Sequence, residues 1–307
     1  MTRPTNIRRV AVLCGGFSKE REVSLVSGHA AERALRSKGL DVTVIDVRRD
    51  MANLVSTIGA AKPDVAFNAL HGRFGEDGCI QGLLDMMSIP YTSSGRLASA
   101  VAMDKPMAKR MFAAAGIPVA EERIVTRAEA ERGDVMTRPY VLKPINEGSS
   151  VGVKIVRAGD NHPPLDDLGL AADDHLMAER FIPGREVTVA VMGDNALAVT
   201  EITTSRGFYD YEAKYATGGS THILPAPLSR PLYDRAMSLS LAAHRILGCR
   251  GVSRADLRLD GEDFCMLEVN TQPGLTPTSL VPEQAAHIGM SFDDLIFWML
   301  EHAQCDA

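Results

Sequence analysis

Residues 254–274 read RADLRLDGEDFCMLEVNTQPG, a pattern that predicts two β-strands joined by a tight turn and followed by a Pro-Gly loop. Within the second apolar run stand two polar residues, Glu268 and Asn270, whose spacing of two places them on one face of a strand. Arg254 and Asp256 repeat that spacing on the preceding strand. Two carboxylates and one amide supply oxygen ligands that suit Mg²⁺ shared with a nucleotide's phosphates. A network of paired charges on an exposed sheet face accounts for the pattern equally well.

The two strands can form one site only in one register. Directly opposed residues of an antiparallel pair share a face, so Asp256 and Glu268 converge only if the loop between the strands has an odd number of residues. We therefore predict a three- or five-residue loop around Gly261, in place of the two-residue Asp-Gly turn that the sequence first suggests. A regular two-residue turn without a bulge would contradict a shared site.

The composition is that of an ordinary globular α/β protein. The 307 residues can form two or three domains, and 45% of them are hydrophobic and 23% charged. The formal net charge of −6 argues against a general nucleic-acid or anionic-membrane binder. Five cysteines without a CxxC motif argue against a zinc site and fit a reducing compartment. Since the N-terminus carries no long apolar run, we expect a cytoplasmic protein without a signal peptide or membrane anchor.

Strand and helix patterns alternate in the N-terminal part of the chain, which predicts a parallel sheet covered by helices. The predicted strands are residues 7–14, 41–47 and 64–70, and the predicted helices are residues 22–37 and 51–60. The turn at Gly15-Gly16 lacks the GxGxxG spacing of a dinucleotide site, so it indicates only a tight strand-to-helix turn.

Two loops of this part meet at the carboxyl edge of the predicted sheet, where parallel sheets bind ligands. Glu20 and Glu22, at the start of the first helix, either compensate the helix dipole or offer a carboxylate to a substrate amine. His71 opens the glycine-rich loop HGRFGEDG, residues 71–78. Alone it would be a hydrogen-bonded loop histidine, but the convergence of the two loops favours a role at a ligand.

The middle of the chain carries a second set of polar groups. Asp104 and Pro106 predict the start of a helix. A strand over residues 139–144 carries Lys143, and the small-residue loop 147–153 that follows offers backbone N–H groups and two hydroxyls to a phosphate. A flexible β-turn is the alternative for that loop.

Two further strands are predicted over residues 175–182 and 185–192. Glu179, Phe181 and Ile182 either form an adenine slot or are ordinary edge-strand residues.

The sequence FYDYEAKY, residues 208–215, has no amphipathic period and reads as a long functional loop or lid. The predicted helices 230–247 and 292–304, the second of which contains Trp298, are assigned to core packing.

Eight blocks of the chain occur in the order found in one protein family. They are GGFSKEREVSLVSG, LHGRFGEDGCIQG, MDK, EGSSVG, FYDYEAKY, RADLRLD, LEVNTQPG and TSLVP. Together they resemble the ATP-grasp superfamily and, within it, the D-alanine–D-alanine ligase family, over essentially the whole chain. The resemblance implies a three-domain α/β fold that is α+β in its ATP-binding part. Its domains would be an N-terminal parallel α/β domain (1–96), a central ATP-grasp subdomain (97–184) and a C-terminal ATP-grasp subdomain with the metal site and the lid (185–307).

The resemblance implies ATP-dependent ligation of two D-alanines through an acyl phosphate, for peptidoglycan precursors. It further implies two Mg²⁺ or Mn²⁺ ions per active site and a homodimer, with no nucleic-acid or membrane partner. A ligase of the same fold with another acceptor, such as D-lactate, is the alternative, and Tyr215 in the lid, where D-lactate-using relatives have histidine, favours the dipeptide. A catalytically inactive nucleotide-binding module conflicts with the intact metal-ligand set, and a nicotinamide dehydrogenase conflicts with the missing GxGxxG.

The resemblance also assigns roles to residues by position. Those that would bind ATP are Lys105, Lys143, Ser150, Glu179, Phe181, Ile182, Glu186 and Leu267. Those that would ligate the metal ions are Asp256, Glu268 and Asn270.

The remaining roles concern the two D-alanines. Glu20 would bind the ammonium of the first, with His71 nearby, and Lys214, Ser279 and Leu280 would bind the second. Tyr215, Ser149 and Glu20 would form a hydrogen-bonded triad that locks the lid. Arg254 and the Gly274 N–H would form an oxyanion hole.

Overall fold

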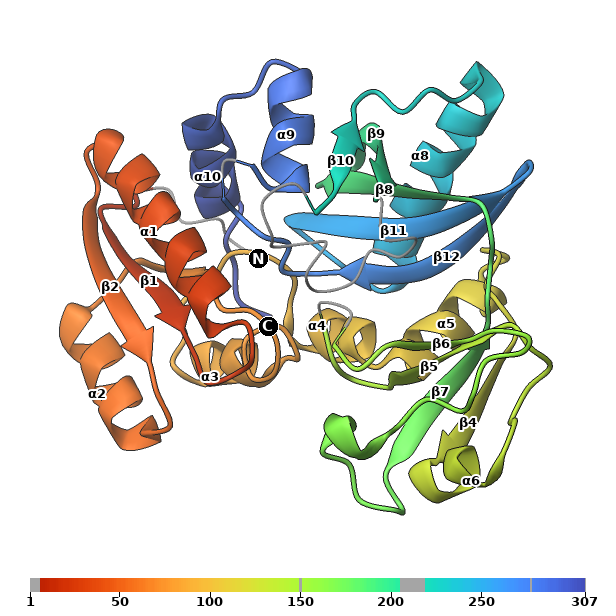
Figure 1. Ribbon diagram of the computed structural model, residues 1–307. Helices are drawn as coiled ribbons and strands as arrows, with labels where there is room; N and C mark the ends of the chain where they lie inside the picture. The colour runs from red at the N-terminus through yellow and green to blue at the C-terminus, as the bar shows by residue number, and fades with distance from the viewer. Residues whose placement is uncertain (1–5, 149–150, 205–218, 277, 307) are drawn as a thin grey trace.

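The computed structural model of the chain describes residues 6–148, 151–204, 219–276 and 278–306. Within these residues the strands form three sheets, one from each successive part of the sequence (Figure 1). No helix among them is both long and apolar enough to span a membrane.

The N-terminal sheet is parallel, as predicted. Its order is β2-β1-β3, formed by β1 (Arg9–Gly15), β2 (Asp41–Val47) and β3 (Val65–Asn68). The associated helices are α1 (Arg21–Ser37), α2 (Met51–Ala61) and α3 (Cys79–Met86). The central strand β1 is buried from Val10 to Cys14 because it has a neighbour on each side and helices over its faces, which explains its continuous apolar run.

The central sheet is antiparallel with the order β4-β7-β5-β6. Its strands are β4 (Glu122–Thr126), β5 (Tyr140–Pro144), β6 (Lys154–Val156) and β7 (His175–Arg180). The helices of this part are α4 (Arg96–Met103), α5 (Lys105–Ala114), α6 (Arg127–Arg132) and the 3₁₀ turn Asp166–Leu168. Helix α5 begins where the sequence predicts, since the Asp104 carboxylate accepts a hydrogen bond from the Met107 N–H at 2.9 Å.

The C-terminal sheet is also antiparallel, with the order β10-β9-β8-β11-β12. Its strands are β8 (Arg185–Met192), β9 (Asn195–Thr203), β10 (Thr221–Ile223), β11 (Val252–Asp260) and β12 (Asp263–Asn270). The helices are α8 (Arg230–Ile246), α9 (Leu280–His287) and α10 (Phe292–Glu301). Trp298 of α10 is partly buried against the core, in line with the packing role predicted for that helix.

The first and last parts of the chain share one hydrophobic core. Val12 of β1 and Phe67 of β3 belong to the same cluster as Leu295 and Met299 of α10. Helices α9 and α10 accordingly lie between the N-terminal and C-terminal sheets (Figure 1). The central sheet has a separate cluster that includes Tyr140. The molecule therefore has a composite body to which the central sheet is joined.

The prediction of a three- or five-residue loop in the β11–β12 hairpin is wrong, but the prediction that Asp256 and Glu268 share one face is correct. Asp260 pairs with Asp263, so the loop is the two-residue turn Gly261-Glu262, with φ of 60° at Gly261. The register then shifts: Leu257 pairs with Met266 but Asp256 pairs with Glu268, which leaves Leu267 as the extra residue of a β-bulge. The bulge thus adds the one extra residue that brings Asp256 and Glu268 to the same face, a role that we had assigned to the loop.

Candidate active site

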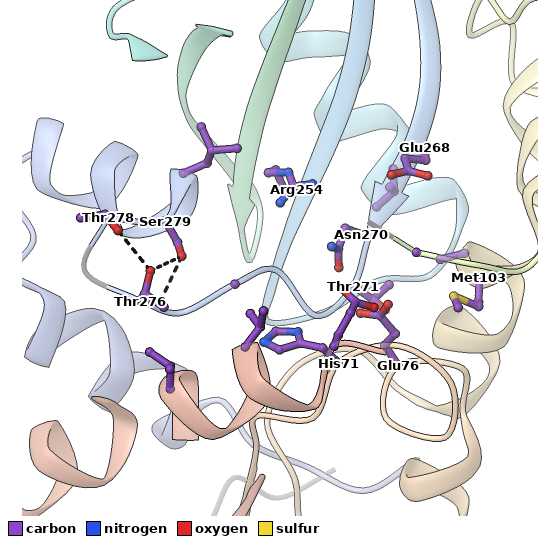
Figure 2. A pocket seen from close by; sticks show the side chains of 18 of the residues that line it. His71, Glu76, Met103, Arg254, Glu268, Asn270, Thr271, Thr276, Thr278 and Ser279 are labelled. Carbon is purple, nitrogen blue, oxygen red and sulfur yellow. Dashed lines mark hydrogen bonds between the residues drawn. The ribbon is translucent and has the colours of Figure 1, made fainter. Parts of the chain in front are cut away.

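Two cavities meet between the three sheets. The large cavity has a volume of about 390 Å³ and is bounded by α1, the loop after β3, β11, β12 and residues 271–276 and 278–280. The narrow cavity has a volume of about 90 Å³ and lies between the central sheet and the β11–β12 hairpin. Lys105 and Glu268 line both, so they mark the junction. In Figure 2, His71 and Glu76 lie on one side of the large cavity and Arg254 and Glu268 on the opposite side.

Every predicted site residue that the structure describes lines one of these cavities. The large cavity is lined by Glu20, His71, Lys105, Arg254, Glu268, Asn270, Gly274, Ser279 and Leu280. The narrow cavity is lined by Lys105, Lys143, Glu179, Phe181, Ile182, Glu186, Asp256, Leu267 and Glu268. The predicted residues Ser149, Ser150, Lys214 and Tyr215 lie outside the described part of the chain. The fold thus brings together residues from nearly the whole length of the sequence.

The predicted metal ligands lie at the junction. Asp256 is directly opposite Glu268 and Arg254 is directly opposite Asn270, so all four share one face of the hairpin. The Asp256 carboxylate accepts hydrogen bonds from Thr188 Oγ1 at 2.6 Å and from Arg254 Nε at 2.9 Å and Nη2 at 2.8 Å. The sheet therefore orients both the carboxylate and the guanidinium.

The donor set fits a cation that is held jointly with phosphates. Asp256 and Glu268 supply carboxylate oxygens, and Asn270 supplies an amide whose Oδ1 accepts a hydrogen bond from the Gln272 N–H at 2.8 Å. In the described residues no group of three or more His, Cys, Asp or Glu side chains could hold a metal by itself. Mg²⁺ typically takes one or two carboxylates and completes its shell with water and phosphate oxygens, which matches this set.

His71 is an uncharged side chain that hydrogen-bonds two segments of the chain to one another. Its Nδ1 donates to the Gln272 carbonyl oxygen at 3.1 Å, because a carbonyl can only accept, and its Nε2 then accepts from Ser27 Oγ at 3.2 Å. Burial lowers the pKa of His71, and the nearby Glu20 charge only partly opposes this. His71 therefore lines the large cavity as an uncharged group that connects α1 to the segment after β12.

Glu76 is a cavity residue that the sequence reasoning missed. It is buried, and burial followed by the charge of Glu20 raises its pKa well above the usual range. A Cβ at Gly148 would lie 3.1 Å from Glu20 Oε2 and 3.3 Å from Glu76 Oε1, so both carboxyl groups crowd this glycine. The only signal in the sequence was an acidic residue inside a glycine-rich loop.

A cluster of hydroxyls forms the far wall of the large cavity. Thr276 Oγ1 and Ser279 Oγ are 2.7 Å apart, and the Thr276 N–H donates to Ser279 Oγ at 3.1 Å (Figure 2). Thr278 Oγ1 lies 3.4 Å from Thr276 Oγ1. These groups stand at the N-terminus of α9, a position that favours an anion because of its unpaired N–H groups. Of the three, only Ser279 was predicted.

The narrow cavity combines charged and apolar walls. Lys143 Nζ donates to Glu179 Oε2 at 2.6 Å on the central sheet, whereas Leu267 belongs to the facing hairpin. Burial opposes ionisation of Glu179, but the charges of Lys143 and Lys109 lower its pKa. At the junction, Lys105 Nζ donates to the Glu147 carbonyl oxygen at 2.5 Å and lies 3.6 Å from Glu268 Oε2.

Arg258, also missed from the sequence, organises one end of the narrow cavity. Its Nε donates to the Ile182 carbonyl oxygen at 3.2 Å and its Nη1 to Glu186 Oε2 at 3.1 Å. The guanidinium carbon also lies 5.9 Å from the centre of the Phe181 ring. Its Nη2 donates to the Gly184 carbonyl oxygen at 3.1 Å, so Arg258 contacts Phe181, Ile182 and Gly184 of the segment between β7 and β8.

Comparison with known proteins is consistent with this site. The family models described as D-ala D-ala ligase N-terminus and D-ala D-ala ligase C-terminus match residues 50–94 and 111–301. A D-alanine–D-alanine ligase from Rhodospirillum rubrum is 60% identical over 305 residues, which are 98% of this chain and 99% of the relative.

Solved structures give the same result. The D-alanine–D-alanine ligase from Bacillus anthracis matches with a TM-score of 0.82 at 31% identity, over 96% of this chain and 97% of that one. The structure of the same ligase complexed with ATP matches with a TM-score of 0.80 at 27% identity, over 97% of each chain. On this agreement of sequence, fold and cavity-lining residues, the chain belongs to the D-alanine–D-alanine ligase family and has the ATP-grasp fold.

Proposed function

We propose that this chain ligates two D-alanines to D-alanyl-D-alanine for peptidoglycan synthesis, with ATP converted to ADP and phosphate. The observation that carries the proposal is the junction of the two cavities. The narrow cavity has the lysines and the apolar strip that a nucleotide needs, and the large cavity has the polar groups that amino acids need. Because both open at Lys105 and Glu268, the γ-phosphate of one ligand and the carboxylate of the other can meet there.

The first step activates a carboxylate, which is a poor electrophile. An oxygen of the first D-alanine's carboxylate attacks the γ-phosphorus, the bond to the β-phosphate oxygen breaks, and an acyl phosphate and ADP result. Phosphoryl transfer requires mainly positioning and charge neutralisation. Lys105 and Lys143 supply positive charge on the ATP side. Asp256, Glu268 and Asn270 would hold two Mg²⁺ or Mn²⁺ ions, which neutralise phosphate charge when bound.

The second step forms the peptide bond. The amine of the second D-alanine, in its neutral form, attacks the acyl carbon. As the tetrahedral intermediate collapses, the bond from the acyl carbon to the phosphate oxygen breaks, and the nitrogen gives up one proton, which leaves with the phosphate. Arg254 and the Gly274 N–H would stabilise the oxyanion of that intermediate. The support for Arg254 is its fixed orientation, since two of its nitrogens donate to Asp256.

The large cavity offers separate surfaces for the two amino acids. Glu20 would bind the ammonium of the first D-alanine, and the neighbouring Glu76, whose raised pKa favours its neutral form, would leave only one negative charge there. Ser279, with Thr276 and Thr278 beside it and Leu280 at the start of α9, would hold the carboxylate of the second D-alanine. Lys214, Tyr215, Ser149 and Ser150 keep their proposed roles in the lid and the phosphate loop.

The proposal includes a cytoplasmic homodimer and three domains at residues 1–96, 97–184 and 185–307. The division into three is supported by the three sheets, each of which lies within one of these ranges. The first and third domains pack against one another through one shared hydrophobic core, which includes residues of β1, β3 and α10.

The test is phosphate release by the purified protein with ATP and Mg²⁺, in parallel with D-alanine, L-alanine, and D-alanine plus D-lactate. We expect release with D-alanine and not with L-alanine, together with D-alanyl-D-alanine detected by mass spectrometry. Release only with another acceptor would leave the mechanism in place and change the substrate. Binding of MgATP without turnover on any amino acid would refute ligase activity.

A further inference from the structure

Lys109 is a buried lysine for which the mechanism above has no role. It lies on α5 one turn after Lys105, and its side chain is only 2% exposed. Three oxygens surround its ammonium: the Ala120 carbonyl oxygen at 3.0 Å, Glu122 Oε2 at 3.0 Å and Glu179 Oε1 in a short contact. A buried ammonium is costly unless it is paired in this way, so the arrangement needs a physical reason.

Part of the reason is electrostatic balance within the central sheet. Glu122 of β4 and Glu179 of β7 are directly opposed in the antiparallel register, so their carboxylates share one face. Like charges in directly opposed positions destabilise a sheet. The Lys109 ammonium lies between them and neutralises the repulsion.

The second part concerns the way in which Glu179 is shared. Its Oε1 contacts Lys109, and its Oε2 accepts a hydrogen bond from Lys143 Nζ at 2.6 Å. Lys143 and Glu179 line the narrow cavity, whereas Lys109 is behind them and anchored at the same time by Ala120 and Glu122. The Lys109 ammonium is thus fixed by the fold, whereas the Lys143 ammonium can reach a ligand in the narrow cavity.

We propose that Lys109 is a positioning residue for ATP: it is the permanent counter-ion of Glu179 and so allows the Lys143 ammonium to leave Glu179 for a phosphate oxygen. Without Lys109, departure of Lys143 would leave a buried carboxylate uncompensated, which is strongly unfavourable. The inference rests on ATP binding in the narrow cavity, which is part of the proposed function. It assigns to Lys109 an effect on nucleotide affinity that a lysine serving only to neutralise the Glu122–Glu179 pair would not have.

The test uses two variants and a matched control. Lys109→Met removes the charge at nearly constant length. Lys109→Met/Glu122→Gln removes one charge of each sign, so the buried group stays neutral and only the pair of Lys143 with Glu179 remains. Glu122→Gln alone is the control, because it alters the other carboxylate partner of Lys109 and leaves the contact with Glu179 in place.

We expect the dissociation constant of MgATP, measured by calorimetry, and KM for ATP to rise at least about 10-fold in both Lys109 variants. The values of kcat at saturating ATP and of KM for D-alanine should stay within about threefold of wild type, since loss of uniform nucleotide binding raises KM alone. The control should bind MgATP within about threefold of wild type. Calorimetry measures MgATP binding even if no dipeptide forms, so the proposal for Lys109 and the proposed ligase activity can be refuted separately.

Wild-type affinity for MgATP in the folded double variant would overturn the proposal, as would equal losses for ATP and D-alanine. Should neither variant fold, ¹⁵N resonances of the lysine ammoniums in the wild-type protein decide the matter. MgATP should then shift the Lys143 signal and leave the Lys109 signal in place. Equal shifts of the two signals would refute a fixed counter-ion.

Discussion

The large and the narrow cavity differ in how their walls are held together. Next to the wall that Thr271 and Gly274 form in the large cavity, the buried Gln272 Nε2 donates to the Asn68 carbonyl oxygen at 2.7 Å, and the Gln272 carbonyl oxygen accepts from His71. These bonds are buried and join parts of the chain that share one core. The narrow cavity lies between sheets whose main hydrophobic clusters are separate and which are joined by the small cluster of Ala120, Ile182 and Cys265. The ion pair of Lys105 with Glu268, at 3.6 Å, stands at the edge of this cavity. We therefore expect the large cavity to keep its shape before ligands bind and the narrow one to adjust to the nucleotide.

The largest expected effect is at the junction of the two cavities. Removal of divalent cations with EDTA should abolish phosphate release, because the carboxylates of Asp256 and Glu268 and the phosphates of ATP would otherwise repel one another. Back-titration with Mg²⁺ or Mn²⁺ should restore it, and EDTA saturated with Mg²⁺ is the control. Turnover that persists in excess EDTA would contradict the metal assignment.

The next effect separates chemistry from binding within the large cavity. Arg254→Ala should lower kcat on the order of 10²–10³-fold, the usual cost of one lost oxyanion donor. Steady-state kinetics with D-alanine and calorimetry with MgATP would check this, and the variant should still bind MgATP. Arg254→Lys, which keeps the charge but loses the two-pronged contact with Asp256, should give an intermediate rate. Near-wild-type turnover of Arg254→Ala would reject the role.

A smaller effect tests the rigid wall itself. Gln272→Leu leaves the buried Asn68 carbonyl oxygen without its 2.7 Å donor, which should cost about 1–3 kcal/mol of unfolding free energy. Because the change lies directly behind Thr271 and Gly274, which line the large cavity, KM for D-alanine should rise and KM for ATP should not. Urea unfolding and steady-state kinetics measure the two. An increase in KM for ATP alone would mean that the two cavities are not held as differently as the structure indicates.

The smallest effect concerns His244, a buried histidine that lines neither cavity and provides a reference for His71. Burial lowers the pKa of His244 to about 4, and its Nδ1 lies 2.7 Å from Ser253 Oγ. The native state then binds fewer protons than the unfolded state between pH 4 and 6.5, so stability is present above pH 6.5 and decreases as the pH falls. At pH 5 the loss should be about 2 kcal/mol relative to pH 7.

His244→Gln should remove that part of the pH dependence, as measured by urea unfolding at several pH values. Its turnover at neutral pH should equal that of the wild type. A variant whose stability falls with pH as steeply as that of the wild type would assign the effect to other groups, of which His71 is the first to examine because burial lowers its pKa as well.

Much of the site followed from local patterns in the sequence. Strand spacing placed Asp256 with Arg254 and Glu268 with Asn270, and Asp104 marked the start of the helix that carries Lys105. These predictions succeed because side-chain period and capping chemistry act over a few residues. The order of eight short sequence blocks also identified the family, because each block is recognised from neighbouring residues and needs no knowledge of how the blocks pack together.

Other features have no local signal. The sequence could not show that Glu76 faces Glu20, or that Lys109 joins Glu122 to Glu179, because each contact forms only when separate elements pack. Position in a glycine-rich loop or on an amphipathic helix is compatible with an exposed side chain as well as a buried one. Burial is what raises the pKa of Glu76, and burial is a property of the assembled fold.

The β11–β12 hairpin separates the two contributions most clearly. The sequence by itself determined that Asp256 and Glu268 belong to adjacent strands joined at Gly261, since turn and strand signals are local. Only the tertiary structure decided how they come to face one another, through a bulge at Leu267 and not through a longer loop. The physical reason is that one extra residue, inserted as a bulge at any point along a strand pair, changes which side chains share a face. The extra residue is accommodated at Leu267, which lines the narrow cavity between the hairpin and the central sheet.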